Sequence, residues 1–158
     1  MKKMINWSVL CFLALAVAAR PAGADGSKLV VVVAKGSPVT NISRTDLKRA
    51  FTGDTVSIDD KLLIPFNLMP GSPARTAFDQ AVLKMSPNEV GRFWVDRKVR
   101  GQSAAPRSLP TPAHVAKVAA KFPGAIGYIP ADQLSADIQP VSVDGVAYTD
   151  AKYDIVIP

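Results

Sequence analysis

Signals for a strand, a turn and a helix follow one another in Ile64-Pro65-Phe66-Asn67-Leu68-Met69-Pro70-Gly71-Ser72-Pro73-Ala74-Arg75-Thr76-Ala77-Phe78. An apolar run over Leu62–Phe66 ends at a Pro-Gly turn. Ser72 then provides a good helix N-cap, and Pro73 suits the first helical position, where its missing N–H costs nothing. Apolar residues recur at helical spacing after it, so the stretch predicts a strand, a loop and a helix that runs to about Met85.

The start of this helix is a candidate anion site. The first backbone N–H groups of a helix have no partner within the helix, and they point with the positive end of the helix dipole toward whatever lies above the loop. Arg75 would add a charged fork suited to phosphate, sulfate or carboxylate. Two interpretations stay open here: the loop binds an anion, or Ser72 only caps a packing helix.

Residues 1–24 have the features of a secretory signal peptide. A positive start, Lys2-Lys3, precedes an apolar segment, Val9–Ala19, that is too short to span a bilayer, and Ala22-Gly23-Ala24 matches the small-x-small cleavage pattern. A retained membrane anchor is the weaker interpretation, because Arg20-Pro21 interrupts the apolar run. We therefore expect one periplasmic domain over residues 25–158, with no membrane insertion once the signal is removed.

The composition narrows the classes of function. The single cysteine, Cys11, lies in the leader, so the mature chain would have no disulfide, thiol nucleophile or cysteine metal site. Cleavage removes three of the 19 basic residues and none of the 13 acidic ones, which lowers the net charge from +6 to +3. Such an excess is too small to argue for binding to nucleic acid or to a membrane.

Strands and helices alternate along the rest of the chain. The Val-rich run Leu29–Ala34 predicts a strand buried on both faces. This order predicts an α/β fold of three layers, in which helices flank a small, mixed but mostly parallel sheet. The remaining predicted elements are helices capped by Ser43, Ser86 and Thr111, strands at Ala125–Ile129, Ile138–Val143 and Tyr153–Ile157, and a hairpin-type turn at Asp144-Gly145.

Catalytic and metal-binding patterns are missing from the sequence. His114 is the only histidine, which rules out a histidine-rich metal site or a Ser/His/Asp triad, and no carboxylate pair is placed for acid–base chemistry. Arg92-Phe93-Trp94 and Arg97 mix basic and aromatic residues as nucleic-acid surfaces do, but helical spacing turns the aromatic side chains toward the core and the charges toward solvent. We expect no enzyme, no cofactor, no metal and no nucleic-acid partner.

Three segments in order resemble one family. Ser43–Gly53 resembles a helix followed by Ile-Phe-x-Gly, and Gly71-Ser72 with Phe78 is similar to a Ser-Gly-Thr phosphate loop at a helix start. Phe122–Tyr128 is close to the signature Pro-Gly-Ala-Ile-Gly-Tyr. Together they resemble the phosphate-binding periplasmic receptors of phosphate ABC transporters, a branch of the type 2 solute-binding proteins.

This resemblance implies an exported protein that binds inorganic phosphate or a similar oxyanion and has a membrane transporter or envelope protein as partner. The ligand-binding residues it implies are Gly71, Ser72, Ala74, Arg75 and Thr76. The family's receptors have two lobes that close on the ligand, whereas this chain is long enough for about one.

The chain also departs from the family within the loop. Pro73 and Ala74 stand where the family has Gly and Thr, and Asn67 and Leu68 stand where a basic residue is expected. The alternative is a single-lobe interaction module that has lost the ligand and docks onto an envelope protein or a second copy of itself. An exposed apolar patch near the loop would favour the module, and a polar cup would favour the binding protein.

Overall fold

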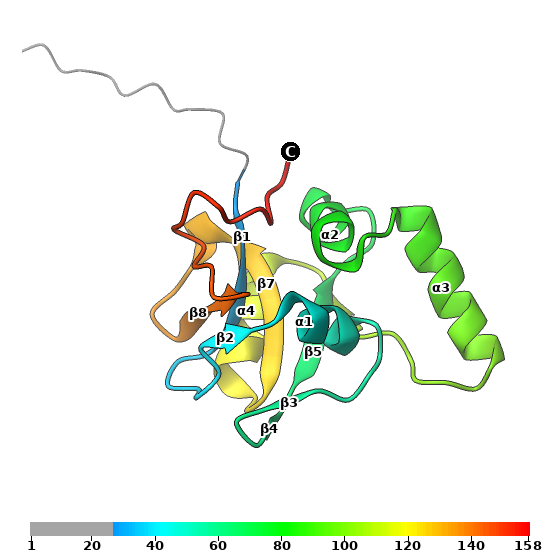
Figure 1. Ribbon diagram of the computed structural model, residues 1–158, viewed down its shortest axis with the longest axis horizontal. Coiled ribbons are helices and arrows are strands. Elements are labelled where there is room, and N and C mark those ends of the chain that lie inside the picture. Colours follow the sequence, from blue (N-terminus) through cyan, green and yellow to red (C-terminus); the bar gives the residue numbers. More distant parts are fainter. Residues whose placement is uncertain (1–26) are drawn as a thin grey trace, which may run out of the picture.

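The computed structural model describes residues 27–158, so the predicted signal peptide lies outside the described residues (Figure 1). One six-stranded sheet forms the centre of the molecule, with the strand order β2-β8-β1-β7-β5-β6, and a small β3–β4 hairpin lies apart from it. The strands are β1 (Leu29–Ala34), β2 (Asn41–Ile42), β3 (Ser57–Ile58), β4 (Lys61–Leu62), β5 (Ile64–Leu68), β6 (Arg107–Leu109), β7 (Ala125–Pro130) and β8 (Ile138–Val143).

β1 is the one strand of this sheet that runs against the others. It pairs antiparallel with β7 on one side and β8 on the other, so Val31 lies between Tyr128 and Val141. The pairs β5–β6, β5–β7 and β2–β8 are all parallel. Leu29–Val33 is almost completely buried, as the unbroken valine run predicted. The predicted mixed, mostly parallel sheet is confirmed.

Four α-helices flank the sheet, and a hydroxyl group begins each of them. The caps are Ser43, Ser72, Ser86 and Thr111, and each side chain accepts a hydrogen bond from the backbone N–H three residues later, as predicted. Two short turns, η1 and η2, complete the set. The helical elements are α1 (Arg44–Phe51), α2 (Pro73–Phe78), η1 (Asp79–Leu83, a π-helix), α3 (Pro87–Val99), α4 (Pro112–Lys121) and η2 (Ala131–Gln133, a 3₁₀ helix).

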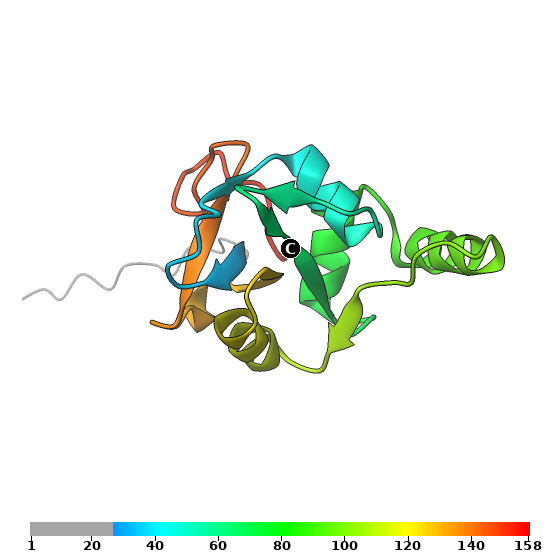
Figure 2. The same ribbon diagram turned by 90° about the horizontal axis from the view of Figure 1, so that it is seen from below.

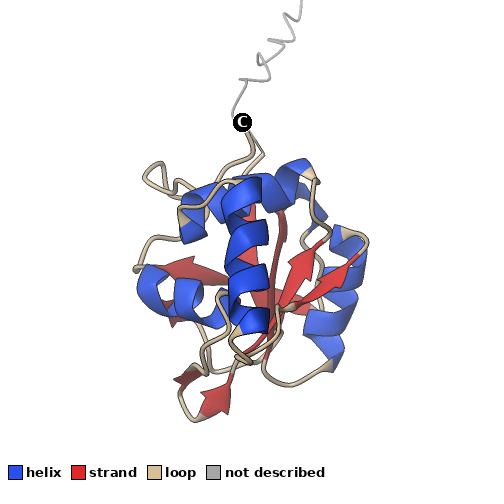
Figure 3. Cartoon of the chain, turned by 90° about the vertical axis from the view of Figure 1, so that its right-hand side faces the viewer, coloured by secondary structure: helices blue, strands red, loops and turns tan. Residues whose placement is uncertain are grey.

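Successive side chains of β7 point to opposite faces of the sheet, and helices cover both faces, so the fold has three layers. Gly127 faces α4, where Val115 lies against it, while Tyr128 faces the other side and packs on Phe51 of α1 and Phe78 of α2. Figure 2 shows α4 and α1 on opposite sides of the strands, and Figure 3 shows helices around the sheet with α3 in front. Within residues 27–158, no helix is long and apolar enough to cross a membrane.

Two sequence predictions need correction. The helix from Pro73 changes to a π-helix at Asp79 and ends at Lys84, whose left-handed φ of 59° stops it before Met85. The prediction of a strand at Tyr153–Ile157 is wrong: Val156 forms only an isolated bridge with Lys28. The reason is that β8 pairs with this edge of β1 from Val31 onward. The C-terminal segment can therefore form backbone hydrogen bonds only with residues 27–29. The predicted turn at Asp144-Gly145 is present, between the bridged Val143 and Val146.

Gly127 provides a test of the packing between the sheet and α4. A Cβ atom at this position would lie 2.4 Å from Cγ1 of Val115, so we expect Gly127→Ala to lower the free energy of unfolding by about 1–3 kcal/mol. Urea unfolding of purified variants measures the change.

Gly91→Ala is the control, because its Cβ would meet open space in an exposed helix and should stabilise by up to about 1 kcal/mol. Adding Val115→Ala to Gly127→Ala should cost less than the sum of the two single changes, since it removes the clash. If the changes in the free energy of unfolding of the two single variants simply added up, the contact between residue 127 and Val115 would not be the source of the destabilisation.

Candidate functional site

The Ser72 loop, residues 69–72, follows the carboxyl end of β5, and Ser72 is the N-cap of the helix α2 that comes after it. Its Oγ accepts a hydrogen bond from the Arg75 N–H at 3.3 Å and donates one to the Met69 carbonyl at 3.0 Å. The Thr76 N–H donates to the Ser72 carbonyl, and Pro73 has no N–H to donate. The loop therefore uses most of its own donors internally, and the Ala74 amide is left in the first turn without a partner among residues 27–158.

Arg75 is turned into the protein and is paired with Asp79. Its Nε lies 2.7 Å from Asp79 Oδ2, its Nη1 donates to the Leu68 carbonyl at 3.1 Å, and both side chains are more than 90% buried. Burial raises the pKa of Asp79 above its ordinary value, while the Arg75 charge and hydrogen bond act in the opposite direction. Asp79 Oδ1 has no hydrogen-bond partner among the described residues. The positive charge predicted at this site is therefore largely neutralised within the protein.

A cavity of about 200 Å³ lies beside the loop, between β5, β6, α2 and α3. β5 contributes Asn67 near its carboxyl end, β6 contributes the paired Ser108, and the segment before β6 adds Ala105 and Pro106. Of the five predicted ligand residues, the cavity brings together Gly71, Arg75 and Thr76, whereas Ser72 and Ala74 do not line it. The other lining residues are Asn67, Pro70, Asp79, Pro87, Val90, Gly91, Trp94, Ala105, Pro106 and Ser108.

Sequence reasoning missed Asn67 and Ser108 as candidates. Asn67 is buried in β5, and its Oδ1 accepts a hydrogen bond from the Tyr128 hydroxyl at 2.8 Å, which leaves the Nδ2 amide as a donor beside the cavity. Ser108 occupies the paired position on β6. An asparagine inside an otherwise apolar strand was the available signal for Asn67, because buried amides are seldom without a specific partner. Ser108 gave no such signal.

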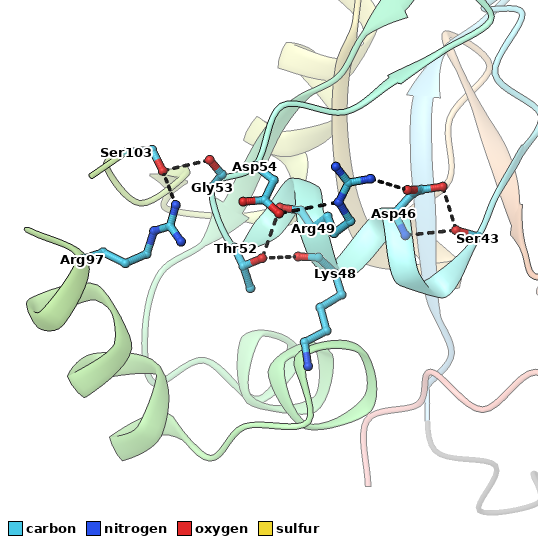
Figure 4. Close-up of polar contacts among 9 residues, drawn as sticks. All are labelled: Ser43, Asp46, Lys48, Arg49, Thr52, Gly53, Asp54, Arg97 and Ser103. Atoms are coloured by element: carbon cyan, nitrogen blue, oxygen red, sulfur yellow. Dashed lines mark hydrogen bonds and ion pairs between the residues drawn. The ribbon is translucent and has the colours of Figure 1, made fainter. Parts of the chain in front are cut away.

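α3 closes one side of this cavity with Val90 and Trp94, and a chain of hydrogen bonds from Arg97 through Ser103 connects it to Gly53 in the loop after α1. The Arg97 guanidinium lies over the Trp94 ring at 5.9 Å and donates from Nη2 to Ser103 Oγ at 2.8 Å; Ser103 in turn donates to the Gly53 carbonyl (Figure 4). The prediction that Arg97 points to solvent is therefore wrong. Its charge is attracted to the aromatic faces, which compensates for its partial burial.

Elsewhere in the described residues, no cluster of histidine, cysteine, aspartate or glutamate side chains could hold a metal ion. His114 is exposed, and its Nδ1 lies 2.7 Å from the hydroxyl of Thr111 at the start of α4. It lies far along the chain from the loop and does not line the cavity.

Removing one partner of the Arg75–Asp79 pair should destabilise the protein strongly, whereas replacing both partners with apolar residues should change the free energy of unfolding little. Arg75→Met or Asp79→Leu alone leaves a buried charge uncompensated and should lower the free energy of unfolding by about 3–5 kcal/mol, whereas the double variant should be close to neutral. Urea unfolding measures all three.

The exposed Arg100–Asp96 pair gives the matched control: Asp96→Leu should cost less than about 1 kcal/mol. A double Arg75/Asp79 variant as unstable as the sum of its single variants would contradict this account of the pair.

No protein-family model matches the sequence, and no curated protein matches it significantly. Solved structures do match the fold. An ABC-type phosphate transport receptor from Vibrio cholerae superposes with a TM-score of 0.66 at 14% sequence identity, over 83% of this chain and 54% of the receptor. PstS from Borrelia burgdorferi gives 0.62 at 17% identity, over 83% of this chain and 55% of PstS.

A protein assigned as a phosphate ABC transporter substrate-binding protein, solved with bound phosphate from Clostridium perfringens, gives a TM-score of 0.60 at 20% identity, over 79% of this chain and 48% of that protein. The Vibrio cholerae protein is a phosphate transport receptor, and the Clostridium perfringens protein is assigned as a substrate-binding protein. The chain spans about half the length of each. The predicted resemblance is thus confirmed at the level of the fold: the chain has the architecture of about half of a phosphate transport receptor.

Proposed function

We propose that the cavity between the Ser72 loop and α3 binds a phosphate-like oxyanion. The observation that carries the proposal is the convergence of hydrogen-bond donors from separate elements on one cavity of about 200 Å³: the Asn67 amide from β5, the Thr76 hydroxyl and Arg75 guanidinium from α2, and the Ser108 hydroxyl from β6. The likeness to a receptor solved with bound phosphate supports the choice of ligand.

The role of each residue follows from its free donors. Arg75 uses Nε and Nη1 internally, so Nη2 is the part of its fork that would meet the anion. Gly71, with a φ of 87°, lets the backbone turn at the cavity edge, and the Ala74 amide would assist from the first turn of α2. Ser72 would act through the loop that it caps.

The protein would work as an exported, non-enzymatic receptor of the periplasm. One half of a receptor leaves a bound anion open to water on one side, where charge interactions and hydrogen bonds are weaker. We therefore expect modest affinity in the isolated protein, and a membrane transporter or envelope protein would supply the opposite wall.

Calorimetric titration with phosphate and with sulfate tests this function. Saturable binding is expected, and the double variant Thr76→Val/Ser108→Ala should weaken it about tenfold, because two hydrogen bonds to an anion are lost. Thr45→Val/Ser135→Ala removes the same groups at exposed positions away from the cavity and should leave the affinity unchanged. Equal affinity in both double variants would place the anion elsewhere.

Ser72→Ala separates capping from binding. We expect it to lower the free energy of unfolding by about 0.5–2 kcal/mol, since the cap of α2 is lost, while the affinity falls less than in the Thr76/Ser108 variant. A variant of unchanged stability that no longer binds phosphate would make Ser72 a direct ligand instead.

Acid should strengthen the binding of sulfate, whose own charge stays constant over the range tested. As pH falls from neutral through the raised pKa of Asp79, the carboxyl becomes neutral while Arg75 remains charged, so the pair changes from net zero to net positive. The affinity measured at pH 4.5 should exceed that at pH 7.5 about three- to tenfold. Asp79→Asn should remove this dependence, and affinity that falls on acidification would contradict the role of the pair.

The second candidate function is the single-lobe interaction module that docks onto an envelope protein or a second copy of itself. The exposure of α3 favours it. Only Val90 of its thirteen residues is buried, the outer face exposes Val95 and Val99, and the helix projects from the body (Figure 1). A folded monomer that binds neither phosphate nor sulfate would favour this candidate. A stable dimer that binds neither anion and dissociates in a Val95→Asp/Val99→Asp variant would place the interface on α3.

A further inference from the structure

A second cavity lies at the end of the sheet opposite to the Ser72 loop, and its charged lining is entirely basic. It holds about 240 Å³ and lies between the turn Lys35–Pro38 after β1, Lys61 on β4, and the end of α4 at Lys121. Pro123-Gly124 completes its wall. The three lysines come from segments far apart in the sequence, and the fold brings them together around one space.

The close approach of these segments is fixed by the backbone. Gly124 has a φ of 83°, and its carbonyl accepts a hydrogen bond from the Ile64 N–H at 2.8 Å; a Cβ on Gly124 would lie 2.3 Å from the Leu62 carbonyl oxygen. The Lys35 N–H donates to the Asp137 carbonyl at 3.0 Å, which holds the start of the turn. The pocket is therefore built by main-chain contacts that do not depend on the lysines themselves.

The side chains that line this pocket include three lysines and no acidic residue. Lys35, Lys61 and Lys121 are exposed, and none of them forms an ion pair within residues 27–158. No acidic side chain lines the pocket; Asp59 and Asp60 form the adjacent hairpin turn and lie outside the lining. This contrasts with the Ser72 cavity, where Asp79 offsets the charge of Arg75.

We propose that this three-lysine pocket binds an anion that carries more than one phosphate charge. Lysine is a compact, strongly hydrated point charge that suits phosphate groups, and three of them around a small space favour a ligand with several oxyanion charges. The volume lies below the roughly 300–1,000 Å³ of sites for drug-sized ligands, which suits a small inorganic or head-group anion.

Two sources would supply this chemistry: a free di- or triphosphate, or the phosphate head groups of an anionic lipid surface. The residues at the rim of the pocket favour the lipid surface. Leu62 and Phe122 directly follow Lys61 and Lys121 in the sequence, each is about half exposed, and both would enter the interface of a bilayer. Free polyphosphates and lipid vesicles are therefore tested on the same variants, which separates the two sources.

The experiment titrates the purified protein with inorganic pyrophosphate and tripolyphosphate by calorimetry, and measures sedimentation with phosphatidylglycerol vesicles at low and moderate salt. The test variant is Lys35→Gln/Lys61→Gln/Lys121→Gln. The control is Lys84→Gln/Lys98→Gln/Lys152→Gln, which removes the same charge from exposed positions away from the pocket.

The expected result is binding of at least one probe that weakens about tenfold or more in the test variant and less than about twofold in the control, with affinity falling as salt rises. Pyrophosphate or tripolyphosphate binding assigns a free ligand, and vesicle binding alone assigns a lipid head group.

Equal losses in the two triple variants would overturn the proposal, since they would show a response to net charge only. Absence of binding to all three probes would overturn it as well. The Thr76→Val/Ser108→Ala variant should leave binding at this pocket unchanged, so the outcome is independent of the function proposed for the Ser72 cavity.

Discussion

The contact between Tyr128 and Phe78 is the interaction on which the site depends. The two rings are stacked, with centroids 3.8 Å apart and planes 3° from parallel, and Phe51 packs against the edge of the pair. This cluster joins β7 to α2 and α1. It sets the position of α2 over the sheet, and with it the positions of Arg75 and Thr76. The hydroxyl of the same tyrosine orients Asn67, so one side chain organises two walls of the cavity.

The elements of the fold followed closely from local chemistry. The valine run of β1, the hydroxyl caps of the four helices and the glycine turns all depend on neighbouring residues, and the structure has them where the sequence predicts them. The π-helical segment at Asp79–Leu83 and the C-terminal segment, which forms a single bridge in place of the predicted strand, were not predicted. For the C-terminal segment the reason is that β8 already occupies the edge of β1, and an occupied strand edge leaves no periodic signal in a sequence.

The candidate site was predictable only in part for the same reason. Gly71, Arg75 and Thr76 belong to the quoted stretch, whereas Trp94 and Ser108 reach the cavity from other elements. From the sequence, Arg75 was predicted to be a free positive charge. The position of Asp79 four residues later does not reveal that both side chains are buried. In the structure Asp79 lies one helical turn further along and shares that burial. Three lysines that form no ion pair among the described residues, Lys35, Lys61 and Lys121, instead line the pocket at the other end of the sheet.

The central place of β1 has a consequence for the order of folding. β1 is the first strand of the described chain, yet its two neighbours are β7 and β8, about a hundred residues later. During synthesis its valine side chains and both of its hydrogen-bonding edges stay without their partners until nearly the whole chain has emerged. A short, highly apolar strand in that state is an aggregation-prone surface, which is removed only when β7 and β8 pair with it.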